Sequence, residues 1–193
     1  MARAKEYTKH IFCIESEFDN DLKHESTSRF MLEQMQNIHK NKLKFIYRKC
    51  ATKTELEHYF KKISLKKYSE YSIIYFCLHG ESNKIHLDGE EVDLIELAEI
   101  VGQKALANKI VHFGSCETIR TKKSELVEFI AKTNSLVVSG FTKEVEYVEG
   151  LAMEMLFFDW CQKFKDTISL ENKINKKYNG LIKQTGFEII HRS

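Results

Sequence analysis

The sequence contains no proline and only eight glycines in 193 residues. Stretches rich in proline, glycine or small polar residues are the usual marks of linkers between domains. Repeats and low-complexity tracts are absent as well, so the chain offers no internal domain boundary. We therefore expect a single domain over residues 1–193, a length within the normal range for one domain.

An excess of charge of one sign is also missing. Thirty Lys and Arg oppose 28 Asp and Glu, which gives a net charge of +2. Without a strong overall field, we expect no nucleic acid and no membrane as partner. No apolar run approaches the roughly 18 residues of a membrane-spanning helix, and the first residues lack the apolar stretch of a signal peptide. A cytoplasmic location is therefore expected.

Closely spaced cysteine pairs are a further absence. The five cysteines have no C-x-x-C spacing, and a chain of this length does not need disulfides to fold, so reduced thiols are expected. Four of them lie inside apolar patterns and are interpreted as small buried residues: Cys13, Cys50, Cys77 and Cys161. The histidines and cysteines show no compact ligand spacing, so we predict no metal and no cofactor.

What the chain does have is an alternation of apolar runs and amphipathic helical patterns. Strands are expected at residues 10–15, 43–47, 72–78, 109–113, 135–139 and 187–191. Helices are expected at residues 26–40, 54–67, 94–103, 124–132 and 147–165. Such alternation is typical of an α/β fold with a mostly parallel sheet and helices on both faces. Residues 84–94 interrupt it and predict a small hairpin on Asp88-Gly89.

Two of the expected strands end at residues that can carry chemistry. The strand at 72–78 runs into His79-Gly80, and the strand at 109–113 leads into Gly114-Ser115-Cys116. Ligands bind where the strands of such sheets end at their carboxyl edge. A cysteine nucleophile needs a histidine beside it and hydrogen-bond donors for the oxyanion. We predict that His79 and Cys116 form a catalytic pair, with the backbone N–H groups of Gly80 and Cys116 as oxyanion donors.

The two motifs, I-I-Y-F-C-L-H-G and I-V-H-F-G-S-C-E-T, resemble those of the caspase-like (clan CD) cysteine peptidases. The segment from Gly114 to Thr118 is most similar to the CHAT branch, and the likeness spans residues 72–160. The resemblance implies a caspase-like fold and a cysteine endopeptidase that attacks proteins or peptides through its thiolate, forming an acyl-enzyme. It also implies a role such as microbial defence. Two positions depart from it: Gly114 replaces an Asp that helps metacaspases bind a basic side chain, and Lys143 replaces an apolar residue.

Two segments are predicted to bind the substrate. Ser139, Gly140 and Phe141 follow a strand that should end beside the catalytic pair, where an extended peptide could lie against them. Glu15 and Glu17 follow the first strand at the same edge, either as the lining of a pocket for a basic side chain or as part of a solvated loop.

Two other functions fit parts of the pattern. The same fold could serve as a catalytically inactive interaction module. A receiver-like signalling domain would use acidic residues after the first strand, but it needs an Asp at the end of the third strand, where His79 stands.

Because an unregulated protease would damage the cell, we expect control by a regulatory protein, a small-molecule activator or self-association.

Overall fold

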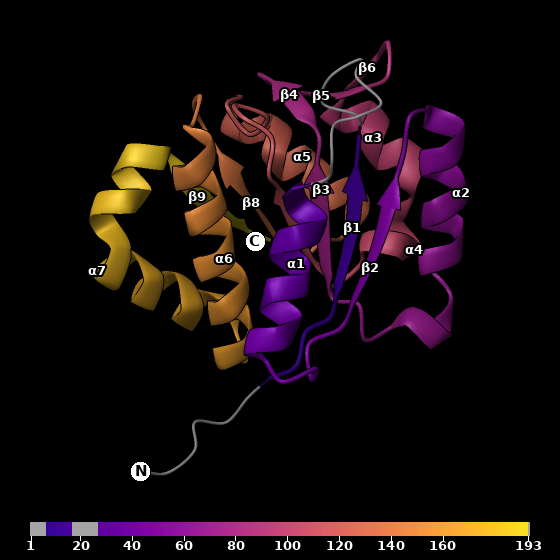
Figure 1. Ribbon diagram of the computed structural model, residues 1–193. Helices are drawn as coiled ribbons and strands as arrows, with labels where there is room; N and C mark the ends of the chain where they lie inside the picture. The colour runs from indigo at the N-terminus through magenta and orange to yellow at the C-terminus, as the bar shows by residue number, and fades with distance from the viewer. Residues whose placement is uncertain (1–6, 17–26, 193) are drawn as a thin grey trace.

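The computed structural model describes residues 7–16 and 27–192, and a six-stranded sheet lies at its centre (Figure 1). The strand order is β2-β1-β3-β7-β8-β9; the first five are parallel and the last is antiparallel. These strands are β1 (Ile11–Glu15), β2 (Phe45–Lys49), β3 (Ile73–Cys77), β7 (Ile110–Phe113), β8 (Val137–Phe141) and β9 (Phe187–His191). All of β3 is buried, which explains why it contains no charged residue.

Helices cover both faces of this sheet (Figure 1). One face carries α1 (Thr27–Ile38), α6 (Tyr147–Lys163) and α7 (Thr167–Thr185). The other carries α2 (Lys53–Ile63), the 3₁₀ turn η1 (Lys66–Tyr68), α3 (Leu94–Val101), α4 (Gln103–Leu106) and α5 (Lys123–Thr133). The predicted fold class, a mostly parallel sheet with helices on both faces, is confirmed.

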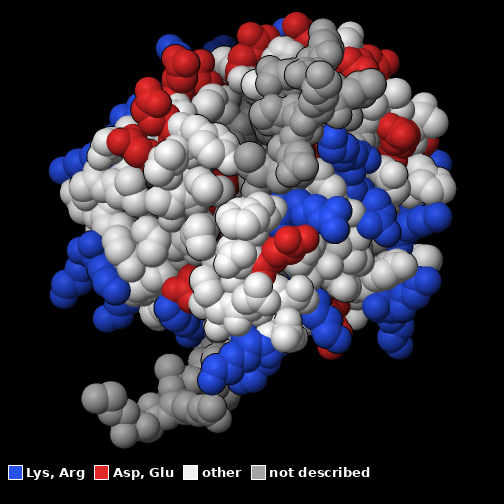
Figure 2. Space-filling model, in the orientation of Figure 1, with Lys and Arg blue, Asp and Glu red and all other residues white. Residues whose placement is uncertain are grey.

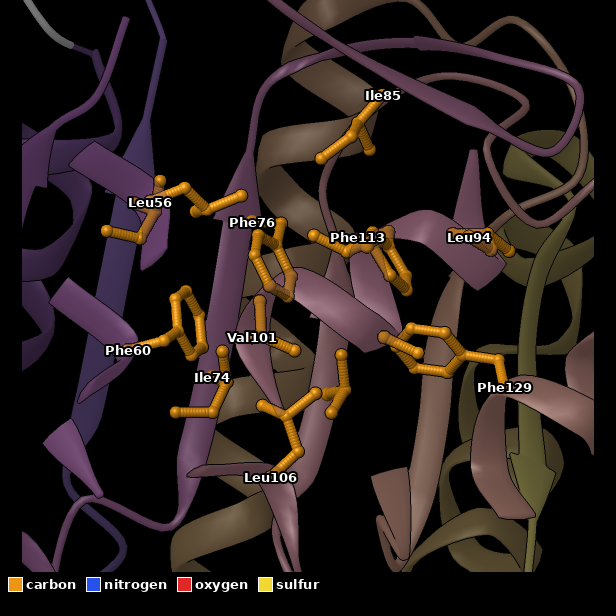
Figure 3. Packing of buried hydrophobic residues seen from close by; sticks show 14 of the residues in the cluster. Leu56, Phe60, Ile74, Phe76, Ile85, Leu94, Val101, Leu106, Phe113 and Phe129 are labelled. Atoms are coloured by element: carbon orange, nitrogen blue, oxygen red, sulfur yellow. The ribbon is translucent and has the colours of Figure 1, made fainter. Parts of the chain in front are cut away.

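The core is divided in two by the sheet, because successive side chains of a strand point to opposite faces. From β3, Phe76 enters the cluster under α2 to α5, and Tyr75 enters the cluster under α1 and α6. Phe76 stacks on Phe113 of the neighbouring strand with ring centroids 5.2 Å apart, and on Phe60 of α2 at 5.5 Å (Figure 3). These aromatic contacts hold β3 and β7 together at the level where both strands end.

A second, three-stranded antiparallel sheet lies above the carboxyl edge of the first (Figure 1). It consists of β4 (His79–Glu81), β5 (Lys84–Leu87) and β6 (Glu90–Asp93). The predicted hairpin over residues 84–94 is confirmed, and Gly89 takes the positive φ of 72° that its turn requires. The structure adds β4, so His79 opens a strand of the small sheet and does not simply end β3.

The chain after residue 163 departs most from the sequence-based expectation. The helix α7 was not predicted; of its buried residues, only Leu170 and Ile174 are large and apolar. The expected strands at 43–47 and 135–139 lie two residues further along, at β2 and β8.

Within the described ranges, no helix is both long and apolar enough to cross a membrane. A single domain over residues 1–193 stays a prediction.

Lys109 stands just before β7, at the sheet edge opposite the small sheet, and it is almost fully buried. Its Nζ has no hydrogen-bond partner among the described residues. Burial lowers the pKa of Lys109 from 10.5 to about 8. The folded protein therefore binds this proton less tightly than the unfolded chain does. The penalty to stability is full below pH 8 and disappears as the pH rises toward 10.5.

We predict that Lys109→Met stabilises the protein at pH 7, by as much as about 3 kcal/mol if the whole shift is recovered. The gain should shrink between pH 8 and pH 10, where the wild-type amine loses its proton. Urea unfolding of both proteins at several pH values measures it. Lys104→Met, at an exposed position of α4, is the matched control and should change stability little. A gain that does not depend on pH would contradict the assignment.

Candidate active site

The parallel pairing of β3 with β7 positions the site. Phe76 of β3 is in register with Phe113 of β7, so the two strands end at the same level. After this level, β3 continues through Leu78 to His79, and β7 continues through Gly114 to Cys116. The two predicted catalytic residues are therefore carried by neighbouring strands to one edge of the sheet.

A cavity of about 450 Å³ opens at this edge, and both His79 and Cys116 line it. His79 is exposed and Cys116 is half-buried, so solvent reaches both side chains. The full lining is Ser28, Tyr75, Cys77, Leu78, His79, Gly114, Ser115, Cys116, Phe141, Val145, Glu146, Tyr147, Gly150, Leu151 and Glu154. The cavity thus lies between the ends of β3 and β7 on one side and the amino-terminal half of α6 on the other.

Gly80 explains how β4 comes so close to the segment that carries Cys116. A Cβ atom at Gly80 would lie 2.0 Å from Oγ1 of Thr118, 2.8 Å from Cβ of Ser115 and 3.0 Å from the Lys84 carbonyl oxygen. Only a residue without a side chain fits between these atoms. The His-Gly pair of the sequence motif therefore has a packing role in addition to its proposed catalytic one.

The turn that follows Cys116 is tied to the small sheet. Glu117 has a positive φ of 57°, a conformation that costs a residue with a side chain about 1 kcal/mol. The Thr118 hydroxyl donates to Oγ of Ser115 at 2.7 Å, and the backbone N–H of Asn83 donates to the Thr118 carbonyl at 3.2 Å. These bonds hold the backbone on which Cys116 sits.

The other four cysteines are buried, as predicted, and all five are free thiols. Burial raises the pKa of Cys50 to about 11 and that of Cys161 to about 12. It raises the pKa of Cys13 and Cys77 well above the ordinary value for a thiol. At neutral pH these four are protonated and shielded, and a protonated thiol is a poor nucleophile. Cys77 also lines the cavity but is buried, so Cys116, the only one of the five that is not buried, is the cysteine that a substrate or reagent reaches most readily.

We predict that limiting iodoacetamide at pH 7.5 alkylates Cys116 first, at least about tenfold faster than any other cysteine, because reaction requires an accessible thiolate. Peptide mapping by mass spectrometry follows the five sites. Cys116→Ala should lose the fast phase, whereas Cys50→Ala should keep it. Faster labelling of Cys13 or Cys161 in the folded protein would show that the accessible thiol has been assigned wrongly.

Glu154 lies among the side chains that line the cavity, and it belongs to a buried polar network. The Tyr75 hydroxyl donates to its Oε2 at 2.8 Å, and its Oε1 lies 3.2 Å from Nε2 of His112. Nδ1 of His112 lies 3.0 Å from Oγ of Ser139. The network links β3, β7 and β8 to α6, and its polar atoms have the partners that buried groups require.

The residues predicted to bind substrate are only partly brought to the cavity. Phe141 lines the cavity, although its side chain is almost fully buried. Ser139 is fully buried, and a Cβ atom at Gly140 would lie 2.8 Å from the Phe113 carbonyl oxygen. The physical reason is that β8 pairs with β7 on one side and β9 on the other, so it offers no free edge to an extended peptide.

Two acidic residues, Glu15 and Glu17, were also predicted to bind the substrate. Glu15 is buried and does not line the cavity; it accepts a hydrogen bond from the hydroxyl of Ser28, which does line it. Glu17 lies outside the described residues. The roles of these residues, and the oxyanion role of Gly80 and Cys116, stay predictions.

Sequence reasoning missed Tyr75 and Glu154. The buried face of α6 includes Met153, Phe157, Phe158 and Cys161. Glu154 shares that face, four residues from both Gly150 and Phe158. The signal available in the sequence was a carboxylate on the apolar face of a long helix, since Glu side chains are rarely buried unless they are paired.

Among the described residues, no group of three His, Cys, Asp or Glu side chains could hold a metal ion.

Gly80→Ala should destabilise the protein by about 1–3 kcal/mol, because the added methyl group overpacks the contact with Ser115 and Thr118. Urea unfolding measures the change. The matched control is Gly180→Ala on α7, where a Cβ atom meets nothing within 4 Å and alanine favours the helix. The control should be neutral or slightly stabilising. Equal effects of the two substitutions would mean that β4 does not pack tightly against the Cys116 turn.

Comparison with solved structures identifies the fold. The chain is similar to a secreted C11 cysteine protease from Bacteroides thetaiotaomicron, solved in complex with an irreversible peptide inhibitor, with a TM-score of 0.56 and 14% sequence identity. The similarity covers 96% of this chain but 66% of the protease chain, slightly under two thirds of its length. The fold is therefore that of the caspase-like cysteine proteases. The comparison does not single out the CHAT branch.

The sequence comparison places the chain in a family. It belongs to the family of unknown function DUF6642, whose model matches residues 8–191. No curated protein matches the sequence.

Proposed function

We propose that the chain is a cysteine endopeptidase that cleaves proteins or peptides with His79 and Cys116. The observation that carries this proposal is that the His and Cys selected from the sequence line one cavity at the ends of adjacent parallel strands. The similarity in fold to a cysteine protease that binds a peptide inhibitor supports it. So does the burial of the other four cysteines.

In the proposed mechanism, the Cys116 thiolate attacks the carbonyl carbon of the scissile bond and a tetrahedral intermediate forms. The backbone N–H groups of Gly80 and Cys116 donate to its oxyanion. His79 protonates the leaving amine, and the C–N bond breaks to give a thioester on Cys116. His79 then takes a proton from water, which attacks the thioester and releases the carboxylic acid and the thiol.

The finer parts of the proposal concern context. We place the protein in the cytoplasm, because all five cysteines are free. Control by a regulatory protein, a small-molecule activator or self-association belongs to the same proposal, as do kinship with the CHAT branch and a role in microbial defence. The catalytically inactive interaction module is the outcome expected if the folded protein hydrolyses no peptide.

We predict that Cys116→Ala and His79→Ala each lower kcat/KM for peptide hydrolysis on the order of 10³-fold or more. The double variant should be little worse than either single one, because the two groups act as a unit. A peptide library analysed by mass spectrometry supplies the substrates. His58→Ala, on the exposed side of α2, is the matched control and should keep full activity.

Thermal unfolding of the same variants should show intact folds, since neither side chain is part of the core. Substantial turnover by Cys116→Ala, with contaminating protease excluded, would overturn the cysteine-peptidase proposal. A folded wild type that leaves every peptide intact, and that no active-site-directed peptide inhibitor labels at Cys116, would favour the inactive module.

A further inference from the structure

The two edges of the central sheet carry different charges. Because five of its strands are parallel, the segments that precede these strands meet at one edge, here called the amino edge, and the cavity lies at the other. The amino edge consists of residues 7–10, 39–44, 64–72, 102–109, 134–136, 163–166 and 192. These residues include eleven Lys and Arg but only two carboxylates, those of Glu70 and Asp166. The small sheet above the opposite edge, residues 79–93, has five Asp and Glu and one Lys.

Figure 2 shows this separation on one face of the molecule. Lys and Arg predominate over its lower part, where the strands of Figure 1 begin, and Asp and Glu gather along its upper edge. The expectation of no membrane partner rests on the net charge of +2, which averages over both edges. At physiological ionic strength a charged partner responds to the charges within about 10 Å of it, and not to the sum over the chain. The amino edge is therefore a basic surface in its own right.

Most of the cations at the amino edge are open to a partner. Six of them are exposed and form no ion pair within the described ranges: Lys40, Lys44, Lys66, Lys67, Lys104 and Lys165. The two carboxylates are already engaged, since Glu70 lies 3.9 Å from His10 and Asp166 accepts the Ser169 backbone N–H at 2.7 Å. The positive charge of this surface is thus not neutralised from within the protein.

Large apolar side chains stand among these cations. Ile38 is 59% exposed at the end of α1, and Leu65 is 46% exposed just before η1. Ile168, in the first turn of α7, is 61% exposed. Exposed aliphatic residues beside lysines are the combination that binds a membrane surface, because the apolar groups enter the boundary between headgroups and acyl chains while the cations contact anionic lipids.

The aromatic rings of this edge are less suited to nucleic acid. Trp160 stacks on Phe164 with ring centroids 5.4 Å apart, and Tyr68 packs edge-on against Tyr71 at 6.1 Å. Lys67 also lies over the ring of Tyr68, 5.0 Å from its centroid. Single strands bind on open aromatic faces, and these rings are occupied by one another and by a cation. The exposed groups are aliphatic, which favours lipid.

We propose that the amino edge docks on the surface of an anionic lipid bilayer, with its lysines over the headgroups and Ile38 and Leu65 at the boundary with the acyl chains. The cavity that holds His79 and Cys116 lies at the opposite edge of the sheet, so it faces away from the bilayer and stays open. The acidic small sheet favours the same orientation, because an anionic surface repels it. This inference goes beyond the peptidase function and does not require it.

The first test measures co-sedimentation of the wild type with two kinds of vesicle, phosphatidylcholine alone and phosphatidylcholine with about 30 mol% phosphatidylserine. The anionic vesicles should bind about tenfold or more tightly, and raising NaCl from about 50 to about 500 mM should remove most of this difference. Equal binding to both vesicles, or binding to neither, would overturn the inference. Retention on single-stranded DNA without binding to vesicles would do the same and assign the surface to nucleic acid.

The second test locates the surface with pairs of substitutions that change the net charge equally. Lys44→Gln with Lys66→Gln, at the amino edge, should weaken binding to the anionic vesicles about tenfold or more. Lys122→Gln with Lys123→Gln, at exposed positions of the opposite edge, is the matched control and should change binding little. All four residues are exposed, so the folds should be intact, and thermal unfolding checks this. Equal losses in the two pairs would show that only net charge matters, which contradicts a defined surface.

Leu65→Ser tests the apolar part and should weaken binding about threefold or more, because less apolar surface leaves water. Val127→Ser, at a position 42% exposed on α5, is its control. The same loss in both variants would rule out insertion at the amino edge.

The third test measures orientation and needs no peptide cleavage, so it is independent of the proposed function. Trp160 is the single tryptophan of the chain and lies in the last turn of α6, at the amino edge. Brominated lipids in the anionic vesicles should quench its fluorescence. Iodoacetamide should alkylate Cys116 at the same rate with and without these vesicles, within about twofold, because the cavity faces away. Protection of Cys116 by vesicles that leave Trp160 unquenched would mean that the other edge binds, and the inference would be wrong.

Discussion

The in-register parallel pairing of β3 with β7 is the constraint on which the site depends. It ends the two strands at the same level, so whatever follows each strand meets at one edge of the sheet. The stacked rings of Phe76 and Phe113 hold this pairing from inside the core. A slip of one residue would turn every side chain of a strand to the other face, and the buried faces on both sides of β3 prevent such a slip.

Close packing at Gly80 holds β4 against the segment that carries Cys116, so the two strand ends have a defined arrangement at this edge. The segments that follow strands could take many conformations, but the small sheet fixes the conformation of the segment after β3. The segment after β7 is fixed by two hydrogen bonds, one from the Thr118 hydroxyl to Ser115 and one from the Asn83 backbone N–H to the Thr118 carbonyl. The candidate nucleophile is therefore carried by a turn whose backbone is held from two sides, which is what a preorganised site requires.

The polar network around Glu154 connects the sheet with the helix that forms the far wall of the cavity. Burying a carboxylate, an imidazole and a phenol inside an apolar core is unfavourable unless each finds a partner, and here each does. Truncating one member would leave the others unsatisfied, so the network resists partial change. It holds α6 in a fixed position over the strand ends and so sets the shape of the cavity.

The amino-acid sequence by itself determined the alternation of strands and helices, the hairpin at 84–94 and the placement of His79 and Cys116 after neighbouring strands. Those features rest on local periodicity and on residues a few positions apart. Only the tertiary structure decided that β8 is closed on both sides, that His79 opens a strand of the small sheet and that Glu154 fills the space beside Gly114. Tyr75 and Glu154 are 79 positions apart, and His112 and Glu154 are 42 apart. Contacts over such separations depend on how whole helices pack on the sheet, which no local pattern in the chain encodes.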